Sequence, residues 1–562
     1  MILFTRPSSL SIQRLINRAI VFLFFLFHIN SFAQTVFIQG YDLEFKNNAE
    51  FNNTNPPKVE LKNLGLYEAL TIAVSKNANI MISAARLDAI KGISRQQKGL
   101  FDYTANAQIG LSRNSSPNNT LNTYTTVTDM YLPYTDASNV NSQLGLTKLF
   151  TNGISVNLSA QHNTFSSNIL DAQGLMNQNS GLLTFQVVLP LLKNSGSAVS
   201  SNLRASEIEA QAAKDDLEFV VNQMVLNSTL AYWDYLGKSK LLEIAQKNEK
   251  SAEKTVQDYQ KLISGDQLPK ADVLLVQGSL KQKTISRIYY QQALLESRKV
   301  LGRSIGLEPD NVMQIEQVSD PFPNYKNGKL DEVLPDLDRV ISSTLGSRAD
   351  LKAAKKRVEK YEILRNAAKN NLSPQLDVLL SASQQGLVEG YSPYQGSAIG
   401  NNWTSAFQPY RPGYGAYLQF RMPLENNEAK GLLQQQQAFV NSSNINLNEL
   451  EYSAKNNIQV VTYAMIRAYD QMTEAKVAEQ KYELSLNNER TKKKLGLSTI
   501  LDVLNVEDRY NNAQVTHVQT QIAYASAVAE FLFQTNNLVV RDEDLFSINV
   551  TNLLNPNMRY LY

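Results

Sequence analysis

The chain has no cysteine among its 562 residues, which excludes disulfide bonds, thiolate metal sites and a cysteine nucleophile. Histidine is nearly as scarce, and His28, His162 and His517 stand far apart, whereas a zinc site needs clustered ligands. Only 19% of the residues are charged and the net charge is +2, so no overall field attracts nucleic acid. Phosphate-binding glycine loops and the Gly-x-Ser-x-Gly motif of hydrolases are also missing. We therefore expect no enzymatic activity, no metal and no cofactor.

Long apolar runs are missing except near the N-terminus, where residues 19–29 read AIVFLFFLFHI. Arginines precede this run, and Ser31 and Ala33 follow it as the small residues of a cleavage site. We expect residues 1–33 to be a signal peptide cleaved after Ala33. An N-terminal membrane anchor is the alternative, but the run is short for about 30 Å of hydrocarbon. No later stretch has the length and character of a membrane helix, so entry into a membrane would require β-strands.

Three blocks have helical periodicity: residues 65–95, residues 197–306 with a break near 264–266, and residues 428–538 with a break near 495–496. In the last block, apolar residues alternate in steps of three and four, as in a coiled coil. They are Ile458, Val461, Met465, Ala468, Met472 and Ala475. The second block begins with a segment of about 100 Å at ~1.5 Å per residue. Helices of this length are unusual in a soluble enzyme.

Five segments between the helices alternate apolar and polar residues, as β-strands do. They cover residues 103–111, 154–160, 183–189, 376–382 and 414–422. A lipid-facing barrel with a wet interior gives this pattern, and so does a half-buried strand of a soluble sandwich. Residues 112–142 are rich in asparagine, serine and threonine, and residues 389–413 in glycine, tyrosine and proline. Both segments fit long loops on the outer side of a barrel.

The sequence contains an internal repeat. Pro190 and Pro423 each follow a strand, 233 positions apart (423 − 190), and Asp272 and Asp502 follow the two helix breaks, 230 positions apart (502 − 272). A third pair of matching segments, 99–102 and 374–377, is 275 positions apart (377 − 102), so the first copy carries about forty additional residues. We expect extended strands or an added extracellular hairpin around residues 143–161. The predicted organisation is a first repeat at 34–306, a connecting segment at 307–345, a second repeat at 346–540 and a tail at 541–562.

The ordered motifs of the two copies resemble those of the TolC family of outer-membrane factors. In the first copy they are LGLYEAL at 64–70, LPL at 189–191 and ADV at 271–273. In the second they are SRADL at 347–351, LSPQL at 372–376 and GLSTILDVL at 496–504. The resemblance implies a mixed α/β membrane protein, in which a homotrimer completes one β-barrel with about four strands per subunit. A long α-helical coiled-coil tunnel would continue the barrel into the periplasm.

The resemblance also implies a location and partners. The chain would lie in the outer membrane of a Gram-negative bacterium, in contact with outer-membrane lipid, with its helical domain in the periplasm. It would be the passive conduit of a tripartite efflux or type I secretion system, docked to a periplasmic adaptor and an inner-membrane RND or ABC pump. No nucleic-acid partner is expected. The alternatives are a structural coiled-coil protein of the envelope without a pore, the adaptor itself and, more remotely, an exported hydrolase.

By motif position, Asp502 falls on an aspartate that narrows the periplasmic entrance of this family, and Asp272 occupies the same place in the first copy. The second aspartate of the family is Asn505 here. Lys493 and Ser498 replace the family's tyrosine and arginine, so its closing network cannot be copied onto this chain. For each aspartate the alternative role is to cap the helix that follows.

The helical tips would contact the adaptor. Gly265 and Gly496 are expected to turn the chain there, because glycine turns at little steric cost. The other expected tip residues are Leu268, Leu497 and Ser498.

Overall fold

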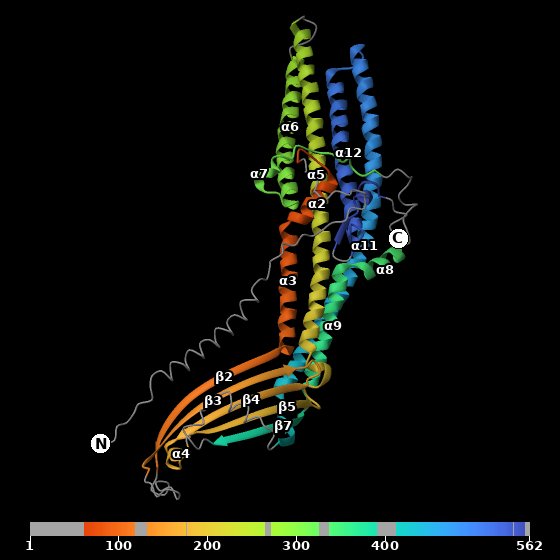
Figure 1. The fold of residues 1–562 in the computed structure, drawn as a ribbon. Helices are drawn as coiled ribbons and strands as arrows, with labels where there is room; N and C mark the ends of the chain where they lie inside the picture. Colours follow the sequence, from red (N-terminus) through yellow and green to blue (C-terminus); the bar gives the residue numbers. More distant parts are fainter. Residues whose placement is uncertain are drawn as a thin grey trace, which may run out of the picture.

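The computed structural model describes residues 61–118, 132–175, 177–264, 271–324, 337–389, 412–542 and 545–556. Long helices occupy one end of the molecule and a curved sheet the other (Figure 1). In the parts just given, no helix combines the length and apolar character needed to cross a membrane. The predicted signal peptide, residues 1–33, lies outside the described residues.

The sheet has six strands in the order β2-β3-β4-β5-β7-β8, and every neighbouring pair is antiparallel. Four come from the first half of the chain: β2 (Tyr103–Pro117), β3 (Tyr134–Leu149), β4 (Ser155–Ser167) and β5 (Gln178–Pro190). Two come from the second half: β7 (Gln375–Glu389) and β8 (Pro412–Arg421). The five alternating segments are confirmed as strands, but six strands exceed the expected four.

The additional pair is β3 and β4, which accounts for most of the surplus residues of the first copy. Its tight turn, residues 150–154, is closed by a hydrogen bond of 2.8 Å from the Phe150 N–H to the Ile154 carbonyl. This turn lies at the helical end of the sheet, because the Gly196 N–H just before α5 donates to the Asn152 carbonyl at 3.0 Å. The hairpin expected around residues 143–161 is therefore present, but its turn faces the helices, so its expected extracellular position is wrong. β3 also occupies part of the segment that we expected to be a loop. Its many polar residues gave no apolar alternation from which a strand could be predicted.

Two helices run without interruption from the sheet to the tips of the helical region: α5 (Ser201–Ser264) and α11 (Asn427–Lys494). They turn back as α6 (Ala271–Ser304) and α12 (Ile500–Gln534). Shorter helices lead into the sheet: α2 (Leu66–Lys76) and α3 (Ala78–Lys98) before β2, and α8 (Leu337–Ser347) and α9 (Ala349–Asn370) before β7. The block predicted at 65–95 is thus two helices, because Asn77 stops α2 and caps α3 by accepting the Asn79 N–H at 2.9 Å.

The helices form a wall with two edges. Near the sheet, α5 packs between α3 and α9, and α9 packs on α11. Toward the tips, α5 packs against α6 and α12, and α12 packs on α11. One edge of the wall therefore consists of α6, α3 and β2, and the other of α11 and β8.

The ends of α6 and α12 repeat the same turn 230 positions apart (536 − 306). Gly306 and Asn536 both have positive φ, at 76° and 58°. The following N–H groups, of Leu307 and Asn537, donate to the carbonyls of Gly302 and Leu532 at 2.9 and 2.8 Å. This is the Schellman arrangement, which satisfies carbonyls at a helix end. The offset equals that between Asp272 and Asp502, which supports a duplicated chain.

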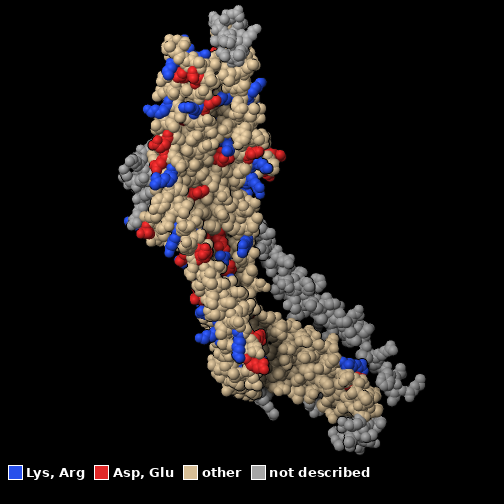
Figure 2. Space-filling model, turned by 180° about the vertical axis from the view of Figure 1, so that it is seen from behind, with Lys and Arg blue, Asp and Glu red and all other residues tan. Residues whose placement is uncertain are grey.

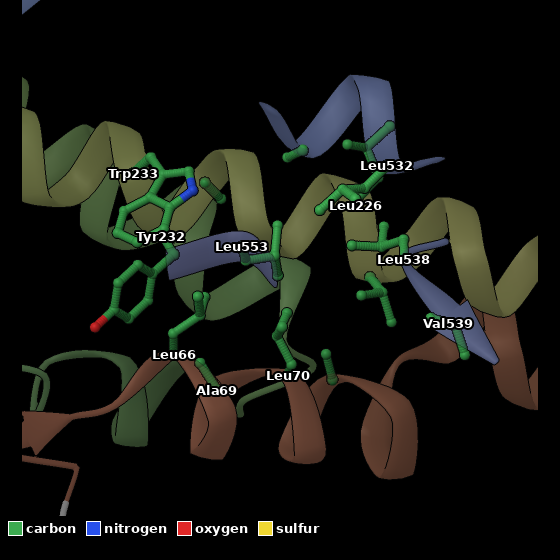
Figure 3. Packing of buried hydrophobic residues seen from close by; sticks show 14 of the residues in the cluster. Leu66, Ala69, Leu70, Leu226, Tyr232, Trp233, Leu532, Leu538, Val539 and Leu553 are labelled. Carbon is green, nitrogen blue, oxygen red and sulfur yellow. The ribbon is translucent and has the colours of Figure 1, made fainter. Parts of the chain in front are cut away.

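The main hydrophobic core lies where α2 crosses α5, midway along the helices (Figure 3). Leu66 and Leu70 of α2 and Trp233 of α5 are fully buried there, together with Leu553 from the C-terminal segment and Leu538 just before it. That segment comprises β9 (Val539–Asp542), β10 (Leu545–Ile548) and α13 (Val550–Leu554). The Tyr232 hydroxyl donates to the Leu64 carbonyl at 3.1 Å, which fixes α2 on α5. Burial raises the pKa of this hydroxyl.

Candidate channel wall and helical tips

The two faces of the sheet differ in polarity from edge to edge. One row of paired residues crosses all six strands on the first face: Ala105, Leu146, Leu158, Phe185, Ala382 and Tyr414. The next row, on the opposite face, is Asn106, Gly145, Ser159, Thr184, Ser383 and Gly413. We call these the apolar face and the polar face.

The apolar face is uncovered by the described residues. Leu111 is 77% exposed, Leu418 68% and Phe185 46%. A soluble sandwich would bury such a face against a second sheet, and none of the described elements does so. The sheet therefore fits the alternative in which this face meets lipid and the polar face meets water.

Charged residues mark the two ends of the apolar face. At the helical end, Lys148 Nζ lies 4.3 Å from the centre of the Tyr103 ring. At the far end, the Arg113 Nε donates to Asp136 Oδ1 at 3.0 Å. Ten residues separate Tyr103 from Arg113 (113 − 103), or about 33 Å along the strand, which at a tilt of ~40° gives a band about 25 Å high. This is the height expected of the lipid-facing band of an outer-membrane protein, ~25 Å. Figure 2 shows that charged side chains otherwise gather on the helical part of the molecule.

The tip of the second hairpin, residues 495–499, is a tight and well-capped turn. Gly496 has φ of 75°, the left-handed region, and its N–H donates to the Lys493 carbonyl at 3.0 Å. The Leu497 N–H donates to the Lys492 carbonyl at 2.9 Å, which completes a Schellman motif. Leu495 and Leu497 are left exposed, at 69% and 75%. The tip thus presents apolar side chains on a rigid backbone.

Asp502 closes the start of α12. Its Oδ2 accepts the Thr499 N–H at 3.0 Å, and the Thr499 Oγ1 accepts the Asp502 N–H at 3.2 Å, which is a capping box. These hydrogen bonds from Thr499 hold the pKa of Asp502 below its ordinary value. The alternative capping role is therefore present, and the carboxylate is also exposed to solvent, as is Asn505 one turn later. A pore-lining role for Asp502 and Asn505 stays a prediction.

Of the corresponding residues in the first hairpin, the structure describes only the backbone of Asp272. Asp272 lies in the first turn of α6, and its side chain is outside the described residues. Gly265 and Leu268 also lie outside them.

Ser498, expected at the tip, donates through its hydroxyl to Glu489 Oε1 at 2.5 Å. This bond and the neighbouring Lys492 keep the pKa of Glu489 low.

Two contacts that the sequence analysis missed join the hairpins just below the tips. Lys283 Nζ of α6 lies 2.6 Å from Asp508 Oδ1 of α12, and Lys493 Nζ of α11 lies 5.2 Å from the centre of the Tyr259 ring of α5. An apolar cluster between the hairpins supports them: Val256, Tyr259, Val276, Leu486, Ile500 and Val503. The partners are distant in sequence, so no local pattern indicates these contacts. Lys493, which replaces a residue of the family's closing network, thus contacts the Tyr259 ring in this chain.

The remaining histidines do not form a site. His517 pairs with Glu479 across α11 and α12, while His162 is in β4 of the sheet. Both side chains are largely shielded from solvent. Among the described residues, no group of three or more His, Asp or Glu side chains is suited to bind a metal.

Comparisons with known proteins point to one fold. Residues 340–534 match the family model described as outer membrane efflux protein. The Campylobacter jejuni CmeC outer membrane channel is 12% identical, with a TM-score of 0.59 over 84% of this chain and 85% of that one. The outer membrane protein VceC of Vibrio cholerae is 16% identical, with a TM-score of 0.57 over 84% and 95%.

The open state of the Neisseria gonorrhoeae MtrE outer membrane channel is 14% identical, with a TM-score of 0.56 over 88% of this chain and 97% of that one. No curated protein matches this sequence. The resemblance inferred from the two sets of motifs is confirmed. Residues 340–534 are similar to the outer membrane efflux protein family, and the chain has the fold of the outer-membrane channels of the TolC family.

Proposed function

We propose that the protein is the outer-membrane channel-tunnel subunit of a tripartite efflux or type I secretion system. Three copies enclose one passive conduit, with the sheets in the outer membrane and the helices in the periplasm. A periplasmic adaptor and an inner-membrane RND or ABC pump complete the system and supply the energy.

The observation that carries this proposal is the wall with two unpartnered edges. Along α6, Ile285, Ile288 and Tyr289 are exposed, and along α11, Ile445, Tyr452 and Tyr463 are exposed. Exposed apolar stripes of this length on both edges indicate that another chain covers them. Because the two edges differ, copies associate head to tail, and such contacts form a closed ring when the rotation between copies closes.

The hairpin tips support docking to an adaptor. Leu495, Leu497 and Leu501 expose apolar side chains at the end of the molecule furthest from the sheet. Leu497→Ser is expected to lower export in cells that depend on this protein, with channel conductance unchanged. Met313→Ser, at an exposed apolar residue distant from the tips, serves as the control and is expected to leave export intact.

Planar-bilayer recording of the purified protein tests the conduit. Discrete conductance steps are expected, and their size is expected to increase when the tip contacts are removed. A pore-free structural protein of the envelope is the second candidate, favoured by the coiled-coil helices alone. Protein that inserts into lipid and never raises conductance, even as Asp502→Ala, would support that candidate instead.

A further inference from the structure

We infer that the membrane part of the assembled channel is a wide barrel of 18 strands, to which each of three copies contributes its six-stranded sheet. In it, β3 and β4 are wall strands whose polar face lines the lumen. This inference rests on the trimeric conduit proposed above. It concerns how the sheets of neighbouring copies join and how wide the lumen is.

The strand directions allow the sheet to close with further copies of itself. β2 runs away from the helices and β8 runs back toward them, so β8 of one copy meets β2 of the next in antiparallel orientation. Both edge strands are solvent-exposed along their length. The apolar residues of the two edges, such as Ile109 on β2 and Leu418 on β8, then continue one lipid-facing surface.

The pair β3 and β4 belongs to this surface and is not an appendage of it. Its residues share the apolar and polar rows that cross the whole sheet, and Gln143 of β3 pairs with Gln108 of β2 and Gln161 of β4. β5 pairs with β4 and not with β2, so the sheet is continuous only through the added hairpin.

The turn of the hairpin is fixed to the start of the helical wall. Gly153 has φ of 92°, and a Cβ at this position would collide with the Asn194 carbonyl oxygen. The Asn194 N–H in turn donates to Asn370 Oδ1 of α9 at 3.0 Å. The added turn therefore lies at the junction between sheet and helices. A strand that belongs to the barrel wall has to extend to this junction.

The circumference of the helical tunnel is compatible with a barrel of 18 strands. Twelve helices spaced about 9.5 Å apart have a circumference of ~114 Å. Eighteen strands spaced about 4.8 Å apart and tilted ~40° have a circumference of ~113 Å, whereas twelve strands give only ~75 Å. Four helices per copy meet the sheet end of the wall, namely α3, α5, α9 and α11. The wider barrel thus matches the helical tunnel that it continues.

The lumen would be correspondingly wide and weakly charged. The backbone of 18 such strands encloses a diameter of about 36 Å, compared with about 24 Å for 12 strands. Side chains such as Gln108, Gln143 and Ser159 line it with neutral polar groups. The channel is therefore expected to pass solutes with diameters of ~20 Å through its membrane part, which leaves size selection to the periplasmic tips.

Single cysteines test the inference, because the chain has none of its own. Gln108→Cys, Gln143→Cys and Leu144→Cys are recorded in planar bilayers before and after addition of a water-soluble cationic methanethiosulfonate. We expect the reagent to lower the current of the first two variants and to leave Leu144→Cys unchanged, because Leu144 is on the apolar face. Neutral polymers of ~20 Å diameter, added from the outer side, are expected to enter the unmodified channel and lower its current.

A response of Gln108→Cys without one of Gln143→Cys would overturn the inference and leave the conduit intact, because β3 would then lie outside the wall. A response of Leu144→Cys equal to that of Gln143→Cys, or exclusion of the polymers, would also overturn it. Absence of any current from all variants and from the unmodified protein would instead refute the proposed conduit.

Discussion

Asp502 combines a helix cap with an exposed negative charge, and two substitutions separate these roles. Asp502→Asn removes the charge, while Thr499→Ala removes the threonine side of the same capping box and keeps the charge. In a ring of three aspartates, we expect the first change to reduce cation selectivity and the second to preserve it. Reversal potentials in asymmetric salt measure this. Equal effects of the two variants would assign Asp502 to the cap alone.

Protonation of the tip carboxylates has a predictable direction. The folded-state pKa values of Asp502 and Glu489 both lie below their ordinary values of 3.8 and 4.5. The ionised carboxylates therefore stabilise the tip fully at a pH above their ordinary pKa values. This stabilisation is lost as the pH falls through their lowered folded-state pKa values. Hydrogen-exchange protection of the tip amides is expected to decrease on acidification in this window. The decrease should be smaller in Asp502→Asn, and an unchanged profile would contradict the assignment.

Gly496 requires a backbone conformation that other L-residues adopt at a penalty. Gly496→Ala is expected to destabilise the tip by about 1–2 kcal/mol, because an alanine Cβ is crowded at positive φ. Gly431→Ala is the matched control: Gly431 is inside α11 with open space around it, so alanine should stabilise the helix by about 0.5–1 kcal/mol. Opening free energies from native-state hydrogen exchange compare the two. The same sign for both changes would contradict the prediction.

The Lys283–Asp508 ion pair joins the two hairpins below their tips. Lys283 is largely buried and Asp508 is exposed, so the pair should contribute about 0.5–1 kcal/mol. We expect Lys283→Ala and Asp508→Ala each to increase the resting current, with little further increase in the double variant. Lys247–Glu243 has the same 2.6 Å separation within α5 alone, and its removal should leave the current unchanged. Equal currents in both sets of variants would exclude a closing role.

How much of these elements the sequence could predict depends on the range of the interactions. The long helices and five strands follow from local periodicity, and Gly496 marks a turn because of its own conformational freedom. β3 could not be recognised in this way, because Asn139, Asn141 and Ser142 give it a loop-like composition and its pairing with β2 and β4 decides its structure. The same limit applies to Lys283–Asp508, whose partners are 225 positions apart. Asp502 was predicted at the tip, but its capping geometry needed the positions of atoms.

For the whole molecule, engineered cysteines can test the proposed closure between copies. Ala107 on β2 and Ala416 on β8 are on the apolar faces of the two edge strands. The double variant Ala107→Cys/Ala416→Cys should give disulfide-linked species of up to three chains on non-reducing gels. Double variants that replace Ala107 with nearby positions such as Ala105 scan the register of the two strands. Each single variant is the control and should stay monomeric in the denatured state. Ladders beyond three chains would indicate an open, non-closing assembly.

The breaks between α2 and α3 and between α8 and α9 have a mechanical consequence. Asn77 Nδ2 donates to the Ser304 carbonyl at the end of α6 at 2.7 Å, and Arg348 Nη1 donates to Gln534 Oε1 at the end of α12 at 2.8 Å. Each copy thus combines two uninterrupted helices, α5 and α11, with two pairs of shorter helices, and side-chain hydrogen bonds hold the break in each pair. We therefore expect a twist of the helical tips to be taken up at these two breaks, so that the sheet rotates less than the tips do.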